Sequence, residues 1–170
     1  MTKMTLSYKR IVNPVDFDEH SIQATPVAAD LARYSAGKIF LLHVVPLTLQ
    51  HQGLPTTVDW HRSQGAAARA RLEEIASEHA EGTSYDLLIR LGDPAQEILS
   101  AAKQLAADVI VMTTHGRTGF SRALHGSVAE NVIREAVCSV LVVRYTNNTN
   151  NQDKQGGPRA FRPSHTQLGR

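Results

Sequence analysis

Several features that define other classes of protein are scarce or missing in this chain of 170 residues. A single cysteine, Cys138, excludes a disulfide framework within the chain, and the simplest expectation is a reducing, cytoplasmic compartment. Aromatic residues make up only 5% of the sequence. No apolar run approaches the roughly 18 residues that a membrane span needs. The opening residues MTKMTLSYKR lack the apolar core of a signal peptide, so neither a membrane protein nor a secreted protein is expected.

A strong charge of one sign is also missing. The chain has 18 Lys and Arg against 16 Asp and Glu, a net charge of +2. The basic excess lies near the C-terminal end, where Lys154, Arg159, Arg162 and Arg170 accompany a single acidic residue, Asp153. The remainder of the chain is close to neutral. Its charge therefore does not predict a nucleic-acid-binding surface.

The composition changes at Tyr145. Before this residue the chain has the apolar and charged content of a globular domain, whereas the stretch TNNTNNQDKQGGPRAFRPSHTQLGR is polar and has no apolar period. We expect one folded domain over residues 6–145 and a flexible basic tail over residues 146–170.

Short β-branched runs alternate with longer stretches of helical periodicity. The expected strands are Lys9–Val15, Lys38–Val45, Tyr85–Arg90, Asp108–Met112 and Ser139–Arg144. Continuous apolar runs at Val109–Met112 and Val140–Val143 are typical of strands that are covered on both faces. The order of elements predicts a single α/β domain with three layers, in which helices flank a doubly wound, five-stranded parallel sheet.

The first two expected helices have recognisable limits. Asp18 is a candidate N-cap for a helix that ends at Gly37, and Pro26 predicts either a kink or a later start. A long helix is expected over Trp60–His79. Its predicted inner face contains Leu72, Ile75 and Ala76.

Two later helices have capping signals. Asp93 and Pro94 supply an N-cap and a proline at the first helical position. The inner face of this helix is predicted to contain Ile98, Leu99, Ala102 and Leu105. Ser127 and Glu130 form a capping box for the last helix. The residues predicted to point inward from that helix are Val128, Val132 and Ile133.

The segment after the fourth expected strand is the most informative for function. Residues 113–127 read TTHGRTGFSRALHGS, with three glycines and two arginines between a strand and a helix. Backbone amides of such a loop can bind an anion, and the following helix N-terminus favours phosphate. Because glycine-rich connections between strands and helices are common, the spacing alone leaves a purely structural loop equally open. Neither GxxxxGK[ST] nor GxGxxG occurs.

Three segments together make the chain resemble the universal stress protein family of the UspA type. They are Arg10–Asp18, Ile39–Val45 and the long stretch from Ala107 to Arg144. The resemblance covers about residues 8–144. It implies a Rossmann-like fold of the adenine nucleotide alpha hydrolase-like type.

The family's ATP-binding members are recognised by the pattern G-x2-G-x9-G-[ST]. Gly116, Gly126 and Ser127 match this pattern, and Thr113 stands where the first glycine is expected. The resemblance implies that the chain binds ATP. The alternative is a nucleotide-independent interaction module of the same family, in which Thr113 has closed the phosphate site.

The resemblance also implies a role for individual positions. Adenosine would lie beside Pro14, Val15 and Asp16, and Val44 would contact the adenine through its backbone. From the residues alone, Asp16 could equally be an acidic residue that precedes a helix. The other implied ATP-binding residues are Thr113, His115, Gly116, Arg117, Thr118, Gly119, Gly126, Ser127 and Val128.

Metal binding by the protein is not expected. The eight histidines form no HxxH or HxH pair, and His43 lies in a buried strand, where a hydrogen-bonded core histidine is expected. Mg²⁺ would accompany ATP through its phosphates. Cys138 precedes the last strand and is expected to be buried and unreactive.

The resemblance implies a regulatory stress-response protein that acts as a homodimer through the last strand, Val140–Val143, and contacts an unidentified protein partner. An unpaired edge strand there would otherwise be exposed. Efficient turnover is not expected, although slow ATP hydrolysis stays open, because the sequence identifies no nucleophile with a positioned base. A nucleotidyl transferase is a third possibility. The absence of a HIGH-type signature argues against it.

Overall fold

Five parallel strands form the central sheet. The computed structural model of the chain describes residues 7–46, 58–113 and 128–144. The strands are β1 (Arg10–Pro14), β2 (Lys38–Pro46), β3 (Ser84–Gly92), β4 (Val109–Thr113) and β5 (Ser139–Val143). Their order is β3-β2-β1-β4-β5, and all neighbouring pairs are parallel. The predicted doubly wound, five-stranded parallel sheet is confirmed.

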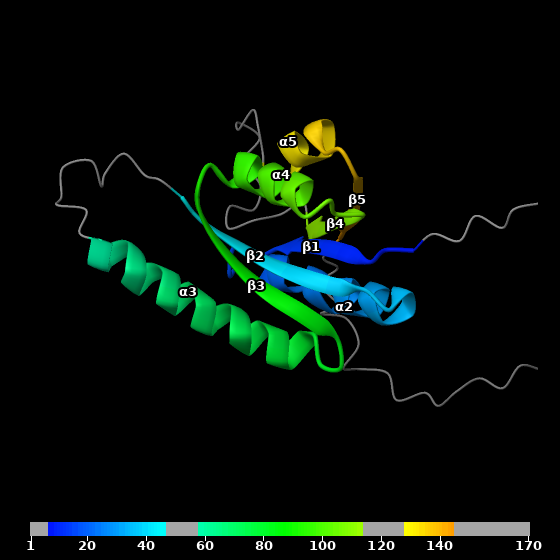
Figure 1. Cartoon of the computed structure of the whole chain (residues 1–170), viewed down its shortest axis with the longest axis horizontal. Coiled ribbons are helices and arrows are strands. Elements are labelled where there is room, and N and C mark those ends of the chain that lie inside the picture. The colour runs from blue at the N-terminus through cyan, green and yellow to red at the C-terminus, as the bar shows by residue number, and fades with distance from the viewer. Residues whose placement is uncertain (1–6, 47–57, 114–127, 145–170) are drawn as a thin grey trace, which may run out of the picture.

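Helices cover both faces of this sheet, so the three predicted layers are confirmed (Figure 1). The helices are α1 (Glu19–Ile22), α2 (Ala24–Ser35), α3 (Val58–His79), α4 (Pro94–Gln104) and α5 (Val128–Glu135). Helices α2 and α3 lie on one face, and α4 and α5 lie on the other. Within the described ranges, none of the helices combines the length and the apolar character that crossing a membrane requires.

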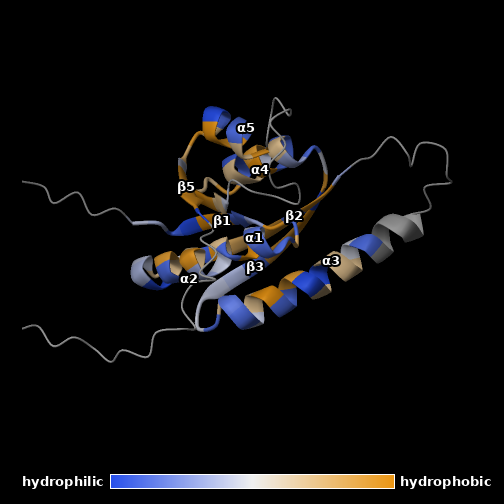
Figure 2. Cartoon of the chain, turned by 180° about the vertical axis from the view of Figure 1, so that it is seen from behind, coloured by the Kyte–Doolittle hydropathy of each residue, from blue (hydrophilic) through white to orange (hydrophobic). Residues whose placement is uncertain are grey.

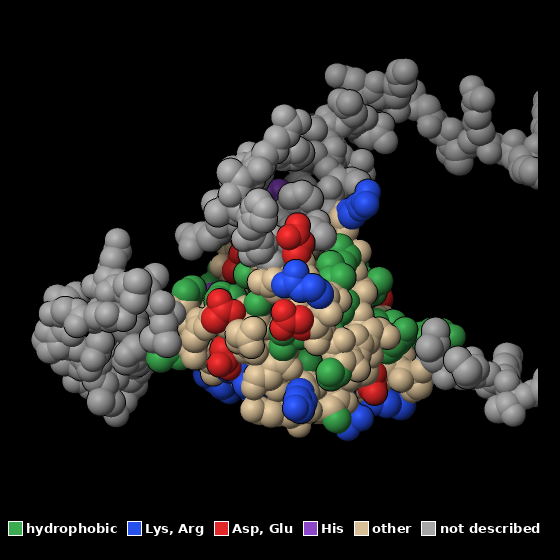
Figure 3. Space-filling view, turned by 90° about the horizontal axis from the view of Figure 1, so that it is seen from above, with side chains coloured by type: hydrophobic (Ala, Val, Ile, Leu, Met, Phe, Trp, Pro, Cys, Tyr) green, Lys and Arg blue, Asp and Glu red, His purple; other side chains and the backbone are tan. Residues whose placement is uncertain are grey.

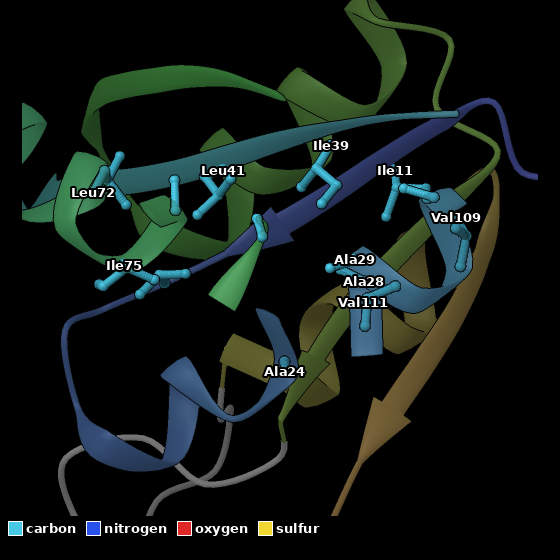
Figure 4. Close-up of a cluster of buried hydrophobic side chains, with 14 residues drawn as sticks. Ile11, Ala24, Ala28, Ala29, Ile39, Leu41, Leu72, Ile75, Val109 and Val111 are labelled. Atoms are coloured by element: carbon cyan, nitrogen blue, oxygen red, sulfur yellow. The ribbon is translucent and has the colours of Figure 1, made fainter. Parts of the chain in front are cut away.

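The core has two halves because successive strand residues point to opposite faces of the sheet. Buried residues on the α2–α3 face include Ile11, Leu41, Val109, Val111, Leu72 and Ile75 (Figure 4). Buried residues on the α4–α5 face include Val12, Leu42, Ile110, Met112, Ile98 and Val132. Figure 2 shows apolar strands between helices that also carry hydrophilic residues. Each half excludes water from one side of the sheet, which accounts for the continuous apolar runs in the sequence.

The predicted first helix is two helices. Asp18 caps α1 as expected, since its side chain accepts a hydrogen bond from the backbone N–H of His20 at 2.9 Å. The helix breaks at Gln23, and Pro26 lies in the first turn of α2, where its missing N–H is not needed. At the end of α2, Ala36 adopts the left-handed conformation. Gly37 is needed next to it, because a Cβ there would lie 2.3 Å from the carbonyl oxygen of Tyr8.

The sequence predicts the positions and the inner faces of α3 and α4 well. The three residues expected to face inward from α3 are all buried. In α4, the Asp93 side chain accepts a hydrogen bond from the N–H of Gln96 at 3.0 Å, and Pro94 occupies the first turn. All four residues predicted for its inner face pack in the α4–α5 half of the core.

The orientation of α5 differs from the expectation. Val132 is fully buried, but Val128 is 37% exposed and Ile133 is 49% exposed. The residue that accompanies Val132 inward is Ala129, three positions earlier, and Ala136 packs against the same cluster. This spacing of three and four residues defines the buried side of the helix, and it leaves Val128 and Ile133 outside it.

Candidate functional site

The candidate site lies where the order of the strands along the sheet reverses, between β1 and β4. From β1 the chain passes to α2 on one face and then to β2, whereas α5 connects β4 to β5 on the other face. The carboxyl ends of β1 and β4 therefore flank a topological switch point. Ligands of open α/β sheets bind at this position.

Pairing between β1 and β4 is short at this point. The register joins Ile11 to Val109 and Val12 to Ile110, and it goes no further. Pro14 has no N–H with which to extend the ladder. Instead, the side-chain amide of Asn13 donates a hydrogen bond to the carbonyl of Val111 at 2.9 Å. A side chain thus replaces backbone pairing between the two strands at the site.

Asn13 was not among the site residues predicted from the sequence. Its side chain is fully buried, and Oδ1 has no hydrogen-bond partner among the described residues. A buried amide oxygen without a partner is destabilising by about 1–3 kcal/mol. One polar residue within the apolar run Ile11–Val15 was the available signal.

Asp16 follows β1 at the start of a tight turn. Its backbone N–H donates a hydrogen bond to Oγ of Ser21 at 3.2 Å, and its Oδ1 accepts one from the N–H of Asp18 at 3.0 Å. The side chain is exposed, while the preceding Pro14 and Val15 are buried. Asp16 therefore does have the local role that the sequence left open. The exposed carboxylate also stands at the switch point, where a ligand would meet it.

His43 lies beside this turn on the neighbouring strand β2. Its Nδ1 is 2.8 Å from the carbonyl oxygen of Val15, and its ring stacks on Phe17 with 3.9 Å between ring centroids. The predicted hydrogen bond of His43 is confirmed, but the side chain is half-buried and is not part of the core as expected. Burial lowers the pKa of His43, although the Val15 carbonyl and the negative charge of Asp16 act in the opposite direction. The neutral form of the ring is therefore favoured in the folded protein.

The remaining predicted residues within the described ranges come from three elements. Val44 is 9% exposed and packs in the α4–α5 half of the core. Thr113 is the last residue of β4, is 8% exposed and pairs with Val143 of β5. Val128 is the first residue of α5. Together with Pro14, Val15 and Asp16, these positions occupy strand carboxyl ends or a helix start, as predicted from the sequence.

The other predicted phosphate-site residues lie outside the described residues. They are His115, Gly116, Arg117, Thr118, Gly119, Gly126 and Ser127. Within the described ranges, no group of three His, Cys, Asp or Glu side chains is placed to hold a metal ion. Acidic and basic side chains are interspersed on the described part of the face that carries α4 and α5 (Figure 3).

Cys138 precedes β5 and is half-buried against the α4–α5 core. Burial raises the pKa of its thiol, so the reactive thiolate is disfavoured. The expectation of an unreactive cysteine is consistent with this environment, although the side chain is less buried than predicted.

Comparisons with known proteins agree with this architecture. A sequence model of the universal stress protein family matches residues 7–144. Universal stress protein MJ0531 of Methanocaldococcus jannaschii is 36% identical over 143 residues, which are 81% of this chain and 82% of that protein. The solved structure of MJ0577, from the same organism, is 30% identical and has a TM-score of 0.73, covering 84% of this chain and 99% of its own.

Two further solved structures share the fold. One is a universal stress protein in complex with cAMP, 22% identical with a TM-score of 0.62, covering 81% of this chain and 98% of that chain. The other is from Archaeoglobus fulgidus in complex with dAMP, 22% identical with a TM-score of 0.59, covering 82% of this chain and all of that one.

Proposed function

Since the chain belongs to the universal stress protein family, we propose that it binds ATP at the carboxyl ends of β1, β2 and β4 and acts as a regulatory protein without efficient turnover. The observation that carries the proposal is the exposed carboxylate of Asp16 at the switch point, between the buried Val15 and the start of α1. Two relatives with this fold, bound to cAMP and to dAMP, support an adenine nucleotide as the ligand.

Thr113 is compatible with this proposal. The residue stands where the family pattern has its first glycine, but its side chain is only 8% exposed. By the alternation of side chains along β4, Thr113 points to the same face as Val111, toward the α2–α3 half of the core. A side chain that faces this half of the core does not occupy the space proposed for the phosphates.

The phosphates would then be bound by the glycine-rich segment and the N-terminus of α5. Backbone amides at a helix N-terminus favour anions, and Gly116, Gly119 and Gly126 permit a close approach of the backbone. Mg²⁺ would be held through the phosphates, which suits its preference for oxygen ligands and retained water. A single cysteine supports placing this protein in the cytoplasm.

Calorimetry with ATP and Mg²⁺ tests this proposal on protein from which any bound nucleotide has been removed. We expect saturable binding of about one ATP per chain. Gly126→Asp should abolish binding, because the new carboxylate would repel the phosphates. The matched control is Gly65→Asp in α3, where an added Cβ meets nothing within 4 Å. A flat titration up to millimolar ATP would mean binding weaker than about −4 kcal/mol and would refute the proposal.

A second role is favoured by the apolar edge of the sheet at β5. Leu141 is 40% exposed on this strand, and Val137 just before it is 79% exposed. We propose that Val140–Val143 pairs with the same strand of a second copy, and that the dimer contacts a further protein. Should ATP binding fail, this nucleotide-independent interaction role becomes the leading one, and analytical ultracentrifugation distinguishes dimer from monomer directly.

A further inference from the structure

Both backbone polar groups of Val15 are bonded to the neighbouring strand β2. The N–H of Val15 donates to the carbonyl of Leu42 at 2.8 Å. The carbonyl of Val15 lies 2.8 Å from Nδ1 of His43. Because a carbonyl oxygen can only accept, Nδ1 of the histidine must carry the proton. Two consecutive residues of β2 thus fix the peptide groups that lead into Asp16.

Phe17, on the other side of Asp16, has an unusual backbone. Its φ angle is +66°, in the left-handed region that bulky residues seldom adopt. The same ring of His43 stacks on Phe17, with an angle of 21° between the two ring planes. A strained backbone of this kind persists only where neighbouring contacts hold it. His43 supplies one such contact through its ring and a second, to Val15, through Nδ1.

The contacts of His43 therefore lie immediately before and immediately after Asp16. We propose that His43 is a positioning residue, which fixes the Val15–Phe17 turn so that the carboxylate of Asp16 is held in place for the adenosine part of the nucleotide. This inference rests on the proposed binding of ATP at Asp16. It assigns His43 two duties that few side chains combine, an N–H donor close to the backbone and an aromatic face.

Substitutions at position 43 separate the two duties. His43→Phe keeps an aromatic ring for Phe17 but removes the donor to Val15. His43→Asn loses the ring but places an amide N–H close to the position of Nδ1. The matched control is His79→Phe, the same change at the end of α3, where the histidine lies 3.6 Å from Glu78. Calorimetry with ATP and Mg²⁺ is performed well below the unfolding temperature, so that every variant measured is folded.

We expect His43→Phe to weaken ATP binding about tenfold, the equivalent of one lost hydrogen bond and a loosened turn. His43→Asn should recover part of this loss, and His79→Phe should bind as the original chain does. The inference is overturned if His43→Phe lowers the melting temperature but leaves the affinity unchanged, or if His43→Asn recovers nothing.

A second variant covers the case in which His43→Phe does not fold. Phe17→Gly removes the stacked ring, and glycine adopts the same φ angle without strain. We expect a folded protein that binds ATP several-fold more weakly, because the turn is less fixed. Full affinity in Phe17→Gly would refute the positioning role. Absence of ATP binding by the original chain would instead refute the proposed function itself, and the inference about His43 with it.

Discussion

The two edge strands of the sheet, β3 and β5, differ in the side chains that they carry. On β3 the polar side chains are bonded to neighbouring elements. The hydroxyl of Tyr85 donates to Glu73 of α3 at 2.8 Å, and Asp86 pairs with Lys38 of β2 at 2.6 Å. Arg90 reaches across to α4. The hydrogen bond to Glu73 also raises the pKa of Tyr85.

The β5 strand has none of these polar side chains. Its sequence after Ser139 is Val-Leu-Val-Val, and the residue before Cys138 is the exposed Val137. Figure 2 shows β5 as an apolar strand at the edge of the sheet. Sheet edges in monomeric proteins are commonly protected by charged side chains, whereas an apolar edge invites pairing. The proposed dimer rests on this difference, because polar side chains cover the edge at β3 while the apolar edge at β5 is the proposed surface for a second copy.

The largest effect is expected from a substitution that disrupts association at β5 and has no effect at β3. Leu91 of β3 and Leu141 of β5 are the same residue type at nearly equal exposure, 42% and 40%. We expect Leu141→Lys to weaken the dimer about 100-fold or more, since a two-fold interface would receive two like charges. The matched Leu91→Lys should leave association unchanged. Ultracentrifugation over a range of concentrations measures both, and an intact dimer in Leu141→Lys would show that β5 is not the interface.

A second substitution tests how firmly the β3 edge is fixed. The guanidinium of Arg90 lies 3.3 Å from both Glu97 and Ser100 and 2.6 Å from Gln104, and its side chain is only 21% exposed. Arg90→Met keeps the aliphatic stem and loses these bonds. We expect the free energy of unfolding to fall by about 1–2 kcal/mol in urea titrations.

Arg71→Met is the control for this loss. Arg71 pairs with Glu74 on the exposed side of α3, where both side chains are at least half exposed. Such a pair contributes about 0.5 kcal/mol or less. Equal losses in the free energy of unfolding would mean that Arg90 stabilises the β3 edge no more than an exposed surface pair does.

The smallest expected effect is the pH dependence of stability that His43 contributes from β2, between the two edges of the sheet. Burial lowers the pKa of His43 below its ordinary value of 6.5. The unfolded chain therefore binds a proton at a higher pH than the folded chain does. The contribution of His43 to the free energy of unfolding is therefore fully present above pH 6.5. It is lost as the pH falls through the lowered pKa of the folded state.

Urea titrations between pH 7.5 and about 5 should show this slope, which other groups can also produce. The difference between the original chain and His43→Phe isolates the contribution of His43. The slope should be shallower in His43→Phe. Identical slopes in the original chain and His43→Phe would show that His43 titrates as it does in the unfolded chain.

The sequence predicts most of the fold because apolar periodicity reports burial directly. Short β-branched and apolar runs predicted all five strands within one or two residues of their observed limits. Capping signals at Asp18 and Asp93 were equally direct, because each side chain bonds to backbone only two or three positions away. The error in the orientation of α5 arose where tertiary contacts select among similar residues. Val128 and Ile133 are as apolar as Val132, and only packing decides which of them faces the core.

The sequence predicts where the candidate site lies in the fold better than it predicts the contacts within the site. Strand ends and the family resemblance placed Pro14, Val15 and Asp16 at the switch point, where the structure has them. The bond from Asn13 to Val111 joins residues 98 positions apart, and that from His43 to Val15 joins residues 28 positions apart. No local pattern encodes such contacts. These contacts depend on which strands become neighbours. The positive φ angle of Phe17 likewise accompanies its stacking on His43, a residue of another strand.

Pro14 has a further consequence during synthesis of the chain. In the finished sheet β1 is central, but its partner β4 is made nearly one hundred residues later. On the ribosome, a growing chain that has already paired β1 with β2 has no β4 to cover the other side of β1. Pro14 offers no backbone donor to a foreign strand there, and proline commonly protects an edge in this way. Pro14 shortens the β1–β4 ladder of the folded protein. In the nascent protein it also shortens the part of β1 that can pair with a foreign strand.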